Sequence, residues 1–428
     1  MPTLTTSRAT VAAHRYARPA TLVARAGILA AVLAGVVYNL YGLPLFHRRF
    51  GDYYRIDLDV YRIGGAAFAR GAQIYGKLPL TEIGKPLPFT YPPLAAIAFS
   101  PMSWMPLAAA GIVMTVVSIV GLFATIVLTL RSLGWLRTSQ LWTAAGVLAV
   151  AFVLEPVFST LNYGQINILL MALVAADCLL ERTPWPRGAL IGLVAALKLT
   201  PAVFVLFFLL RKDFRAAIVT AISFAGCTLV GFALAAGDSV KYWTSVLPDS
   251  NRIGKPAYAA NQSIIGVLAR LGIDNMRTPL WILAAAGVFI IAVVAMRRAF
   301  AAGEVSVALG VNALAGLLVS PVSWSHHWVW VVPLLLSLTV LAYRRRNAVL
   351  GAWILLGLVV FHYAPHWRLA HGRWNGIGWP LPDQLLAASY VWWGLGTLAL
   401  LAVSASLSSR AYPESGRPTS PSSARTCS

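Results

Sequence analysis

The stretch "LAAAGIVMTVVSIVGLFATIVLTL", residues 107–130, decides the class of fold, because it is apolar and carries no charged side chain. At a rise of about 1.5 Å per residue, a helix of this length crosses a hydrocarbon core of about 30 Å. The rest of the chain has the same character, since 58% of its 428 residues are hydrophobic and only 11% are charged. A soluble protein carries more charge on its surface. The sequence therefore predicts an all-α polytopic membrane protein.

Eleven further apolar stretches repeat this pattern, so we expect about twelve transmembrane helices. The first stretch follows several arginines and lacks a small-x-small cleavage site, which predicts a retained signal anchor. Two short stretches meet at "KLTP" and form either two broken helices or one re-entrant hairpin. The eleven expected spans are 23–45, 140–156, 166–181, 188–199, 202–211, 214–236, 279–296, 304–320, 328–343, 347–363 and 384–407.

Short clusters of Lys and Arg lie between these spans, and they fix the expected orientation. By the positive-inside rule, the clusters and both termini are cytoplasmic. The first long loop, 46–106, then faces outward and carries short interfacial helices. We expect a cytoplasmic tail at 1–22, a transmembrane domain at 23–408 and a disordered, Ser/Pro-rich cytoplasmic tail at 409–428.

The net charge of +20 raises the question of nucleic-acid binding. No Lys/Arg patch interleaved with stacking aromatics occurs on a soluble segment, so nucleic acid is not an expected partner. The positive-inside rule is the simpler explanation of this charge. The expected location is a plasma membrane, with the functional site on its outer side.

The segment "RIDLDVYR", residues 55–62, places two aspartates in a chain that holds only 14 acidic residues. Two residues turn a helix by about 200°, so Asp57 and Asp59 cannot face one pocket and should have different roles. Asp59 lies three residues before Arg62, which predicts a surface ion pair. Asp57 either caps the helix or acts as a general base at the membrane surface.

Several polar groups in the expected outer segments are candidates for binding. Tyr91 lies in "PLPFTYPP", where prolines either mark the membrane interface or shape the wall of a site. The segment "EPVFSTLNYGQIN" carries polar side chains that suit either helix–helix hydrogen bonding or sugar recognition. Lys198 places an ammonium at a broken helix, where it suits a phosphate. The polar residues of "EPVFSTLNYGQIN" are Glu155, Asn162, Gln165 and Asn167.

Two more segments complete the set. In "SPVSWSHHWVW", His326 and His327 point about 100° apart on a helix, so one can reach a pocket while the other packs. A phosphate or sugar contact is favoured over a metal, because no spacing such as H-E-x-x-H is present. The "DSNRIGKPAYAANQS" loop is either a solvated loop or a surface that attracts an anionic headgroup through its basic and amide side chains. Those side chains are Arg252, Lys255, Asn261 and Gln262.

The motifs "DLDVY", "PFTYPP", "YGQIN", "LKLTPA", "NQS" and "SPVSWSHHWVW", in this order, resemble an actinobacterial enzyme family. This is the family of polyprenol-phosphate-mannose-dependent α-(1→2)-mannosyltransferases, glycosyltransferase family 87, and the resemblance implies a GT-C-type membrane fold. It covers about residues 50–345. The segments "RTPWPRG", "DSVKYW", "AYRRRN" and "SYVWW" are similar to the member that branches the mannan of lipomannan and lipoarabinomannan. The phosphatidylinositol mannoside enzyme is the alternative.

The resemblance also implies roles for single residues. Asp57 opens the D-L-x-V-Y motif and corresponds to the catalytic base, whereas Asp59 is expected to have a structural role. The expected substrates are a polyprenyl-phosphate-mannose donor and an acceptor that is a lipid-linked mannan or a phosphatidylinositol mannoside, and no cofactor or metal is expected. The resemblance also places His326 and His327 by the donor phosphate. From the residues themselves we expect further donor-binding groups at Lys198, Tyr91, Gln165 and Asn167, and acceptor-binding groups at Arg252, Asn261, Gln262 and Glu155.

Two alternatives remain at this stage. Twelve spans also fit a polytopic transporter of a lipid or sugar, although transporters hold their substrate near the membrane midplane, whereas the polar residues here gather on one face. Another GT-C reaction, such as arabinose transfer, uses the same architecture with a different donor.

Overall fold

The computed structural model describes residues 8–41, 54–135, 137–369 and 376–404. Within these ranges every regular element is helical, and the one extended pairing is an isolated bridge between Asn261 and Trp324. The prediction of an all-α chain is therefore confirmed.

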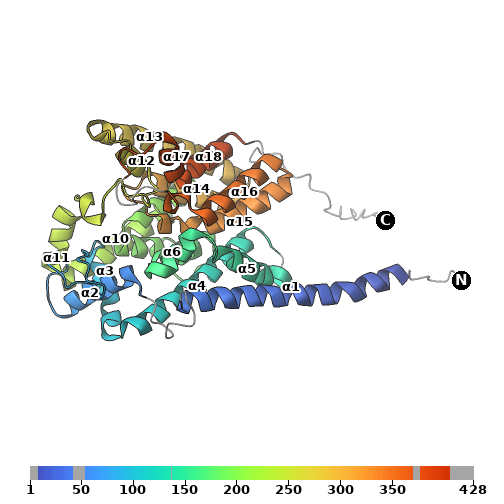
Figure 1. Cartoon of the computed structure of the whole chain (residues 1–428), viewed down its shortest axis with the longest axis horizontal. Helices are drawn as coiled ribbons and strands as arrows, with labels where there is room; N and C mark the ends of the chain where they lie inside the picture. The colour runs from blue at the N-terminus through green and yellow to red at the C-terminus, as the bar shows by residue number, and fades with distance from the viewer. Residues whose placement is uncertain (1–7, 42–53, 136, 370–375, 405–428) are drawn as a thin grey trace, which may run out of the picture.

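The helices follow one another with short connections (Figure 1). In chain order they are α1 (Arg8–Tyr41), α2 (Ile56–Ala69), α3 (Pro93–Phe99), η2 (Ser100–Trp104), α4 (Leu107–Ser132), α5 (Arg137–Ala151), α6 (Glu155–Tyr163), α7 (Asn167–Leu179), α8 (Ala189–Leu197), η3 (Thr200–Phe204), α9 (Val205–Leu210), α10 (Phe214–Leu234), α11 (Ala236–Lys241), η4 (Tyr242–Val246), η5 (Ser250–Ile253), α12 (Ile264–Arg270), α13 (Asp274–Ala301), α14 (Val305–Val319), η6 (Ser325–Trp330), α15 (Val331–Arg345), α16 (Ala348–Tyr363), η7 (Pro365–Trp367), α17 (Leu381–Ala387) and α18 (Ser389–Val403).

Six helices are long and apolar enough to cross a membrane, and the number rises to eight if each of two bent pairs is one span. The bent pairs are α5 with α6, at 78°, and α17 with α18, at 67°. Three of the expected spans are apolar helices of only 10–17 residues, at Asn167–Leu179, Thr200–Leu210 and Val305–Val319. The chain is thus a multi-helix membrane protein. The count of twelve, the orientation of the termini and the GT-C type stay predictions.

Burial separates central helices from peripheral ones. The segment Ser325–Arg345, formed by η6 and α15, is 83% buried, whereas the window on α10 is only 17% buried although it is just as long. An apolar helix with an exposed surface suits contact with lipid. Among the six long apolar helices of the described residues, the histidine pair therefore lies at the start of the most buried one.

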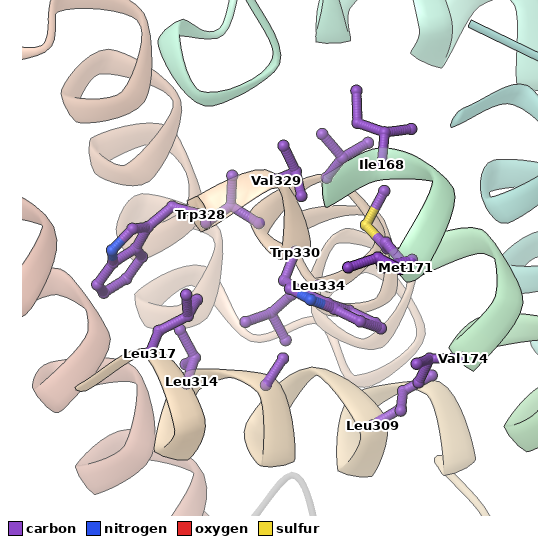
Figure 2. Close-up of a cluster of buried hydrophobic side chains, with 14 of the residues drawn as sticks. Ile168, Met171, Val174, Leu309, Leu314, Leu317, Trp328, Val329, Trp330 and Leu334 are labelled. Atoms are coloured by element: carbon purple, nitrogen blue, oxygen red, sulfur yellow. The ribbon is translucent and has the colours of Figure 1, made fainter. Parts of the chain in front are cut away.

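A compact apolar cluster surrounds this central helix (Figure 2). Side chains from α7, from α14 and from η6 and α15 meet there, with Trp330 reaching between Met171 and Leu314. Trp328 is fully buried on the other side of η6. Two large indoles in close packing fix the rotation of η6, because dense cores tolerate few alternative arrangements.

The start of α1 and the short helices of the first long loop lie at opposite ends of the molecule (Figure 1). Helix α1 starts at the end of the molecule farthest from α2, α3 and α11, and it begins at Arg8, inside the expected tail of 1–22 (Figure 1). The predicted short helices of the first long loop are present as α2, α3 and η2. Residues 46–53 of that loop and the tail 409–428 lie outside the described residues.

Candidate functional site

Helix α2 presents Asp57 toward the interior of the protein. The helix begins at Ile56, with Arg55 in an extended conformation at the N-cap position and no side-chain capping bond. Asp57 therefore lies one residue inside the first turn, half-buried, and does not cap the helix. The capping alternative is wrong, and the carboxylate is available for another purpose.

Asp59 has a structural environment. Its Oδ2 atom accepts hydrogen bonds from the backbone N–H of Glu82 at 2.8 Å and from the hydroxyl of Tyr54 at 3.2 Å. The predicted pair with Arg62 is present at 3.8 Å, but Asp59 is only 5% exposed, so the pair is not a surface pair. Asp59 thus holds the following loop onto α2.

Gln165 connects Asp57 to two tyrosines. The side-chain oxygen of Gln165 accepts hydrogen bonds from the hydroxyl groups of Tyr61, at 2.7 Å, and Tyr91, at 3.2 Å. The two hydroxyl groups also lie 2.8 Å apart. With its oxygen occupied in this way, Gln165 uses its amide N–H to donate a hydrogen bond to Asp57.

Gly164 sets the distance between α2 and Gln165. It ends α6 in the left-handed conformation, with φ of 70°. A Cβ atom at this position would lie 2.7 Å from Cβ of Leu58 and 3.0 Å from Cβ of Arg55. The missing side chain therefore lets α2 pack directly against the backbone that carries Gln165.

Lys198 lies at the predicted break between α8 and η3, in an extended conformation. Its ammonium donates hydrogen bonds to Oδ1 of Asn167 at 2.8 Å and to the Tyr91 hydroxyl at 3.3 Å. Nε2 of His327 lies 3.3 Å from the same nitrogen. Lys198 thus connects α7, the proline-rich turn at Tyr91 and η6.

Asp57 and Lys198 modify one another electrostatically. Burial raises the pKa of Asp57 to about 6, although the hydrogen bond from Gln165 and the charge of Lys198 both lower it. A carboxylate with a pKa this close to neutrality can exchange protons at physiological pH.

The two histidines have different surroundings, as their spacing predicts. The ring planes of His326 and His327 are nearly perpendicular, at 87°. The ring of His326 packs on Tyr163, and its backbone carbonyl accepts hydrogen bonds from Thr160 at 2.8 Å and Asn167 at 3.1 Å. His327 reaches Lys198, whereas His326 is anchored to α6 and α7.

A narrow cleft of about 60 Å³ opens beside Lys198. Lys198, Asn167 and His327 contribute polar side chains to its lining. The apolar cluster of Figure 2 contributes others, among them Met171 from α7 and Leu317 from α14. Cationic and amide groups thus meet apolar side chains in one cleft.

Glu155, a predicted acceptor-binding residue, lies in a separate buried cluster. Its Oε1 atom accepts hydrogen bonds from Ser159 at 2.6 Å, Ser325 at 2.7 Å and Nε1 of Trp367 at 2.8 Å. The hydroxyl of Tyr390 donates to Oε2 at 2.8 Å. The hydrogen-bonding positions of this carboxylate are therefore filled by side chains of the protein itself. The carboxylate in turn helps to position η6 and η7.

Asn261 and Gln262 are likewise buried and bonded within the protein. Oδ1 of Asn261 accepts hydrogen bonds from the backbone of Ser323 at 3.0 Å and from the hydroxyl of Ser263 at 2.9 Å. The side chain of Gln262 donates to the carbonyl of Ala387 at 2.7 Å. These amides fix the 255–263 loop against the segment that leads into η6.

Arg252 lies where its charge reaches Tyr75, which contacts the turn at Tyr91. It is half-buried, and its charge acts on Tyr75, whose hydroxyl donates to the carbonyl of Tyr91 at 2.6 Å. Burial raises the pKa of Tyr75, and the charge of Arg252 opposes that rise. Arg252 is thus connected electrostatically to the residue that holds the Tyr91 turn.

Tyr61 is the main participant that the sequence did not single out. It lies four residues after Asp57, on the same helical face, and this i,i+4 spacing is the signal that identifies it. Among the described residues, no group of three or more His, Cys, Asp and Glu side chains could hold a metal ion. The expectation that no metal is used stays a prediction.

Comparison with known proteins gives a consistent result. The family model described as Glycosyltransferase family 87 matches residues 89–321. A Mycobacterium tuberculosis protein named polyprenol-phosphate-mannose-dependent alpha-(1-2)-phosphatidylinositol mannoside mannosyltransferase is 44% identical over 86% of this chain and 88% of its own length. The protein of the same name from Mycolicibacterium smegmatis is 45% identical over 81% of this chain and 83% of its own length.

Two more distant similarities complete the comparison. A pentamannoside mannosyltransferase of Mycobacterium tuberculosis, also named as polyprenol-phosphate-mannose-dependent, is 33% identical over 83% of this chain and 82% of its own length. The crystal structure of ArnT from Cupriavidus metallidurans bound to undecaprenyl phosphate aligns with a TM-score of 0.39 at 15% identity, over 88% of this chain and 76% of that chain.

Proposed function

Because this chain belongs to glycosyltransferase family 87, in which it is an α-(1→2)-mannosyltransferase, we propose that it moves mannose from polyprenyl-phosphate-mannose to the 2-hydroxyl of a mannose in a lipid-linked mannoside. The observation that carries the site assignment is the joining of Asp57, Gln165 and Lys198 in one cluster. Family membership also removes the transporter alternative.

Asp57 acts as the general base in this proposal. It takes the proton from the acceptor 2-hydroxyl while the oxygen forms a bond to C1 of the donor mannose. The bond between C1 and the phosphate oxygen breaks at the same time, and its electron pair leaves with the lipid phosphate. Attack on a β-linked donor from the opposite face inverts C1 and yields an α bond. The raised pKa of Asp57 supports this role, because a base with a pKa of about 6 is ionised at neutral pH and still accepts a proton effectively.

Lys198 and His327 stabilise the leaving group. A mannosyl phosphodiester gains one negative charge when it leaves as a phosphate monoester, so cationic and hydrogen-bonding groups near that oxygen lower the barrier. The contact of Lys198 with His327 at 3.3 Å supports a shared role at the donor phosphate. His326 would act through its carbonyl, by fixing the segment that presents His327.

The cleft beside Lys198 suits the phosphate end of the donor. Lys198, Asn167 and His327 face the phosphate in this proposal, and apolar side chains of α7 and α14 contact the first carbon atoms of the lipid. Such a site takes its donor from the bilayer, so we also propose that it faces the outer side of the plasma membrane. There the donor is a lipid phosphate and not a nucleotide sugar.

Two acceptors are candidates. The names of the 44% and 45% identical relatives favour a phosphatidylinositol mannoside. The motifs "RIDLDVYR", "RTPWPRG" and "SYVWW" favour the mannan of lipomannan and lipoarabinomannan, with α-(1→2)-mannose branches as the product. Both acceptors present a mannose 2-hydroxyl to the same base, so the difference lies in the surfaces that bind the rest of the acceptor.

A transfer assay with purified protein tests the proposal. Polyprenyl-phosphate-mannose is supplied with either a phosphatidylinositol mannoside or a synthetic α-(1→6)-mannoside, and the new linkage is identified by NMR. We expect an α-(1→2)-linked product, with the higher kcat/KM identifying the acceptor. Transfer to neither acceptor, or a product with another linkage, would contradict the proposal.

A further inference from the structure

Three half-buried aromatic side chains from separate segments form one surface, which we call the aromatic wall. Tyr258 comes from the 249–263 loop, Trp324 precedes η6, and Trp367 ends η7. The ring of Tyr258 lies 5.6 Å from that of Trp324 and 6.0 Å from that of Trp367, at angles of 67° and 68°. The mechanism proposed above uses none of these rings.

Glu155 ties Trp367 and the residue after Trp324 to a single atom. Its Oε1 accepts the indole N–H of Trp367 at 2.8 Å and the hydroxyl of Ser325, the residue after Trp324, at 2.7 Å. A buried carboxylate that accepts several hydrogen bonds holds its donors firmly, because breaking any bond leaves a buried polar group without a partner. The chain next to Trp324 is therefore held in place relative to the indole of Trp367.

The third ring is held by backbone contacts. The N–H of Ser325 donates to the carbonyl of Ala260 at 2.9 Å, and Asn261 forms the isolated bridge with Trp324. Gly254 has φ of 135°, and a Cβ there would lie 3.0 Å from the Trp324 ring. The loop that carries Tyr258 thus packs closely on Trp324, which gives the wall a rigid form suited to binding.

The wall is continuous with the proposed donor-phosphate site. The backbone N–H of His327 donates to the carbonyl of Trp324 at 2.8 Å, and the His327 side chain contacts Lys198. A molecule on the wall therefore lies next to the segment that carries the proposed phosphate-binding histidine.

Aromatic faces of this kind match the chemistry of a pyranose. The ring face of a sugar carries C–H groups that adjacent oxygens make slightly positive, and the face of an aromatic ring is slightly negative. A surface that combines rigid aromatic rings with a few polar groups at its edge is typical of a specific binding site for a small molecule.

We propose that the aromatic wall binds a second sugar of the acceptor, adjacent to the mannose that receives the transfer. This inference rests on the function proposed above. The donor contains one sugar, which must lie between the leaving-group residues and the base. An additional sugar-binding surface therefore serves the acceptor, and Glu155, Asn261 and Gln262 support acceptor binding indirectly by positioning the wall.

Acceptor length provides the test. The full-length protein is assayed with polyprenyl-phosphate-mannose and with methyl α-mannoside, α-(1→6)-mannobiose and α-(1→6)-mannotriose. We expect kcat/KM to fall about tenfold for the di- and trisaccharide in Trp324→Ala and Trp367→Ala, mainly through KM, and to stay unchanged for the monosaccharide. Trp104→Ala is the matched control, because this tryptophan is 77% exposed and lies away from the wall's three segments.

Phenylalanine variants separate stacking from folding. Trp367→Phe keeps an aromatic face but loses the N–H that Glu155 accepts, so it should retain most of the preference for longer acceptors. Saturation-transfer NMR of mannotriose with donor-free protein gives a second readout, and it should lose its signal in Trp324→Ala/Trp367→Ala. An equal loss for all three acceptors in folded variants, or no loss for any, would overturn the inference. Absence of transfer by the parent protein to every acceptor would instead reject the proposed function, while the NMR signal would still report on the wall.

Discussion

Two carboxylates, those of the half-buried Asp57 and the buried Glu155, differ in the donors that surround them. Glu155 accepts four hydrogen bonds from uncharged side chains that the fold holds in place. Asp57 has one such donor, Gln165, and its other main partner is the charge of Lys198. A carboxylate satisfied by fixed donors serves as a structural acceptor. A carboxylate with few fixed donors and an ammonium group nearby keeps the ability to take up a proton.

The comparison also explains why burial alone does not identify the base. Asp59, at 5% exposed, is more buried than the half-buried Asp57. Its carboxylate nevertheless accepts hydrogen bonds from the backbone N–H of Glu82 and the hydroxyl of Tyr54. The distinguishing feature is therefore the number of fixed donors, and the following predictions alter that number or the charge beside it.

The largest effect is expected from Asp57→Asn. Removal of the proposed base should lower kcat by about 10²- to 10⁴-fold and leave the thermal stability of the protein nearly unchanged. Asp59→Asn is the control on the same helix, and it should lower the stability while kcat per folded molecule is retained. Both are measured by mannose transfer and thermal unfolding in detergent. Wild-type turnover in Asp57→Asn would show that another group accepts the proton.

Glu155→Ala should act on stability instead. It leaves three buried donors and the half-buried Trp367 indole without their acceptor, so we expect the free energy of unfolding to fall by about 3–5 kcal/mol. Glu181→Ala, at an exposed position, should change it by less than about 0.5 kcal/mol. Chemical denaturation of the purified variants measures both. If Glu155→Ala were as stable as the parent, the proposed contrast between the two carboxylates would fail.

Lys198→Met should have a smaller effect on rate and an additional effect on pH dependence. Loss of the ammonium at the leaving group is expected to lower kcat by about 10- to 100-fold, in line with the strength of a charge-assisted hydrogen bond. Because the Lys198 charge lowers the pKa of Asp57, its removal should also move the acid limb of the profile to higher pH. The exposed Lys77→Met serves as the control. An unshifted acid limb would mean that the two groups are not coupled.

The pH profile of the parent enzyme should show the smallest effect. Asp57 must be ionised to act as a base, so kcat/KM should fall about tenfold between neutral pH and pH 5, below its pKa of about 6. A flat profile from pH 5 to 7 would exclude Asp57 as the titrating residue.

Periodicity and charge were sufficient to predict the all-α membrane class and the break at Lys198. They also separated Asp57 from Asp59, because a step of two residues on a helix forces the side chains apart. The approach of Lys198 to His327 could not be derived in this way, since the residues are far apart in sequence and only the packing of η6 brings them together. The resemblance to a family supplied the roles that geometry alone left open.

The sequence was less informative for the predicted acceptor residues. Glu155, Asn261 and Gln262 are polar residues in expected outer segments, which made direct contact with a ligand a reasonable prediction. In the folded chain their side chains form hydrogen bonds with other parts of the protein. These bonds join segments that are far apart in sequence, so the sequence alone does not predict them. The sequence does not predict a binding role for Trp324 and Trp367, because tryptophans are common at membrane interfaces.

The glycine at position 164 has a consequence for the interpretation of genetic variants. An exchange of glycine for alanine adds one methyl group and is ranked among the mildest substitutions. Here that methyl group would meet Cβ of Leu58 at 2.7 Å and move α2 away from Gln165, so the base and the donor site would separate although each keeps its own residues. Displacements of about 1 Å can lower turnover by about 10²-fold. An alanine at this position would therefore resemble a catalytic lesion in a folded protein whose reactive groups are all intact.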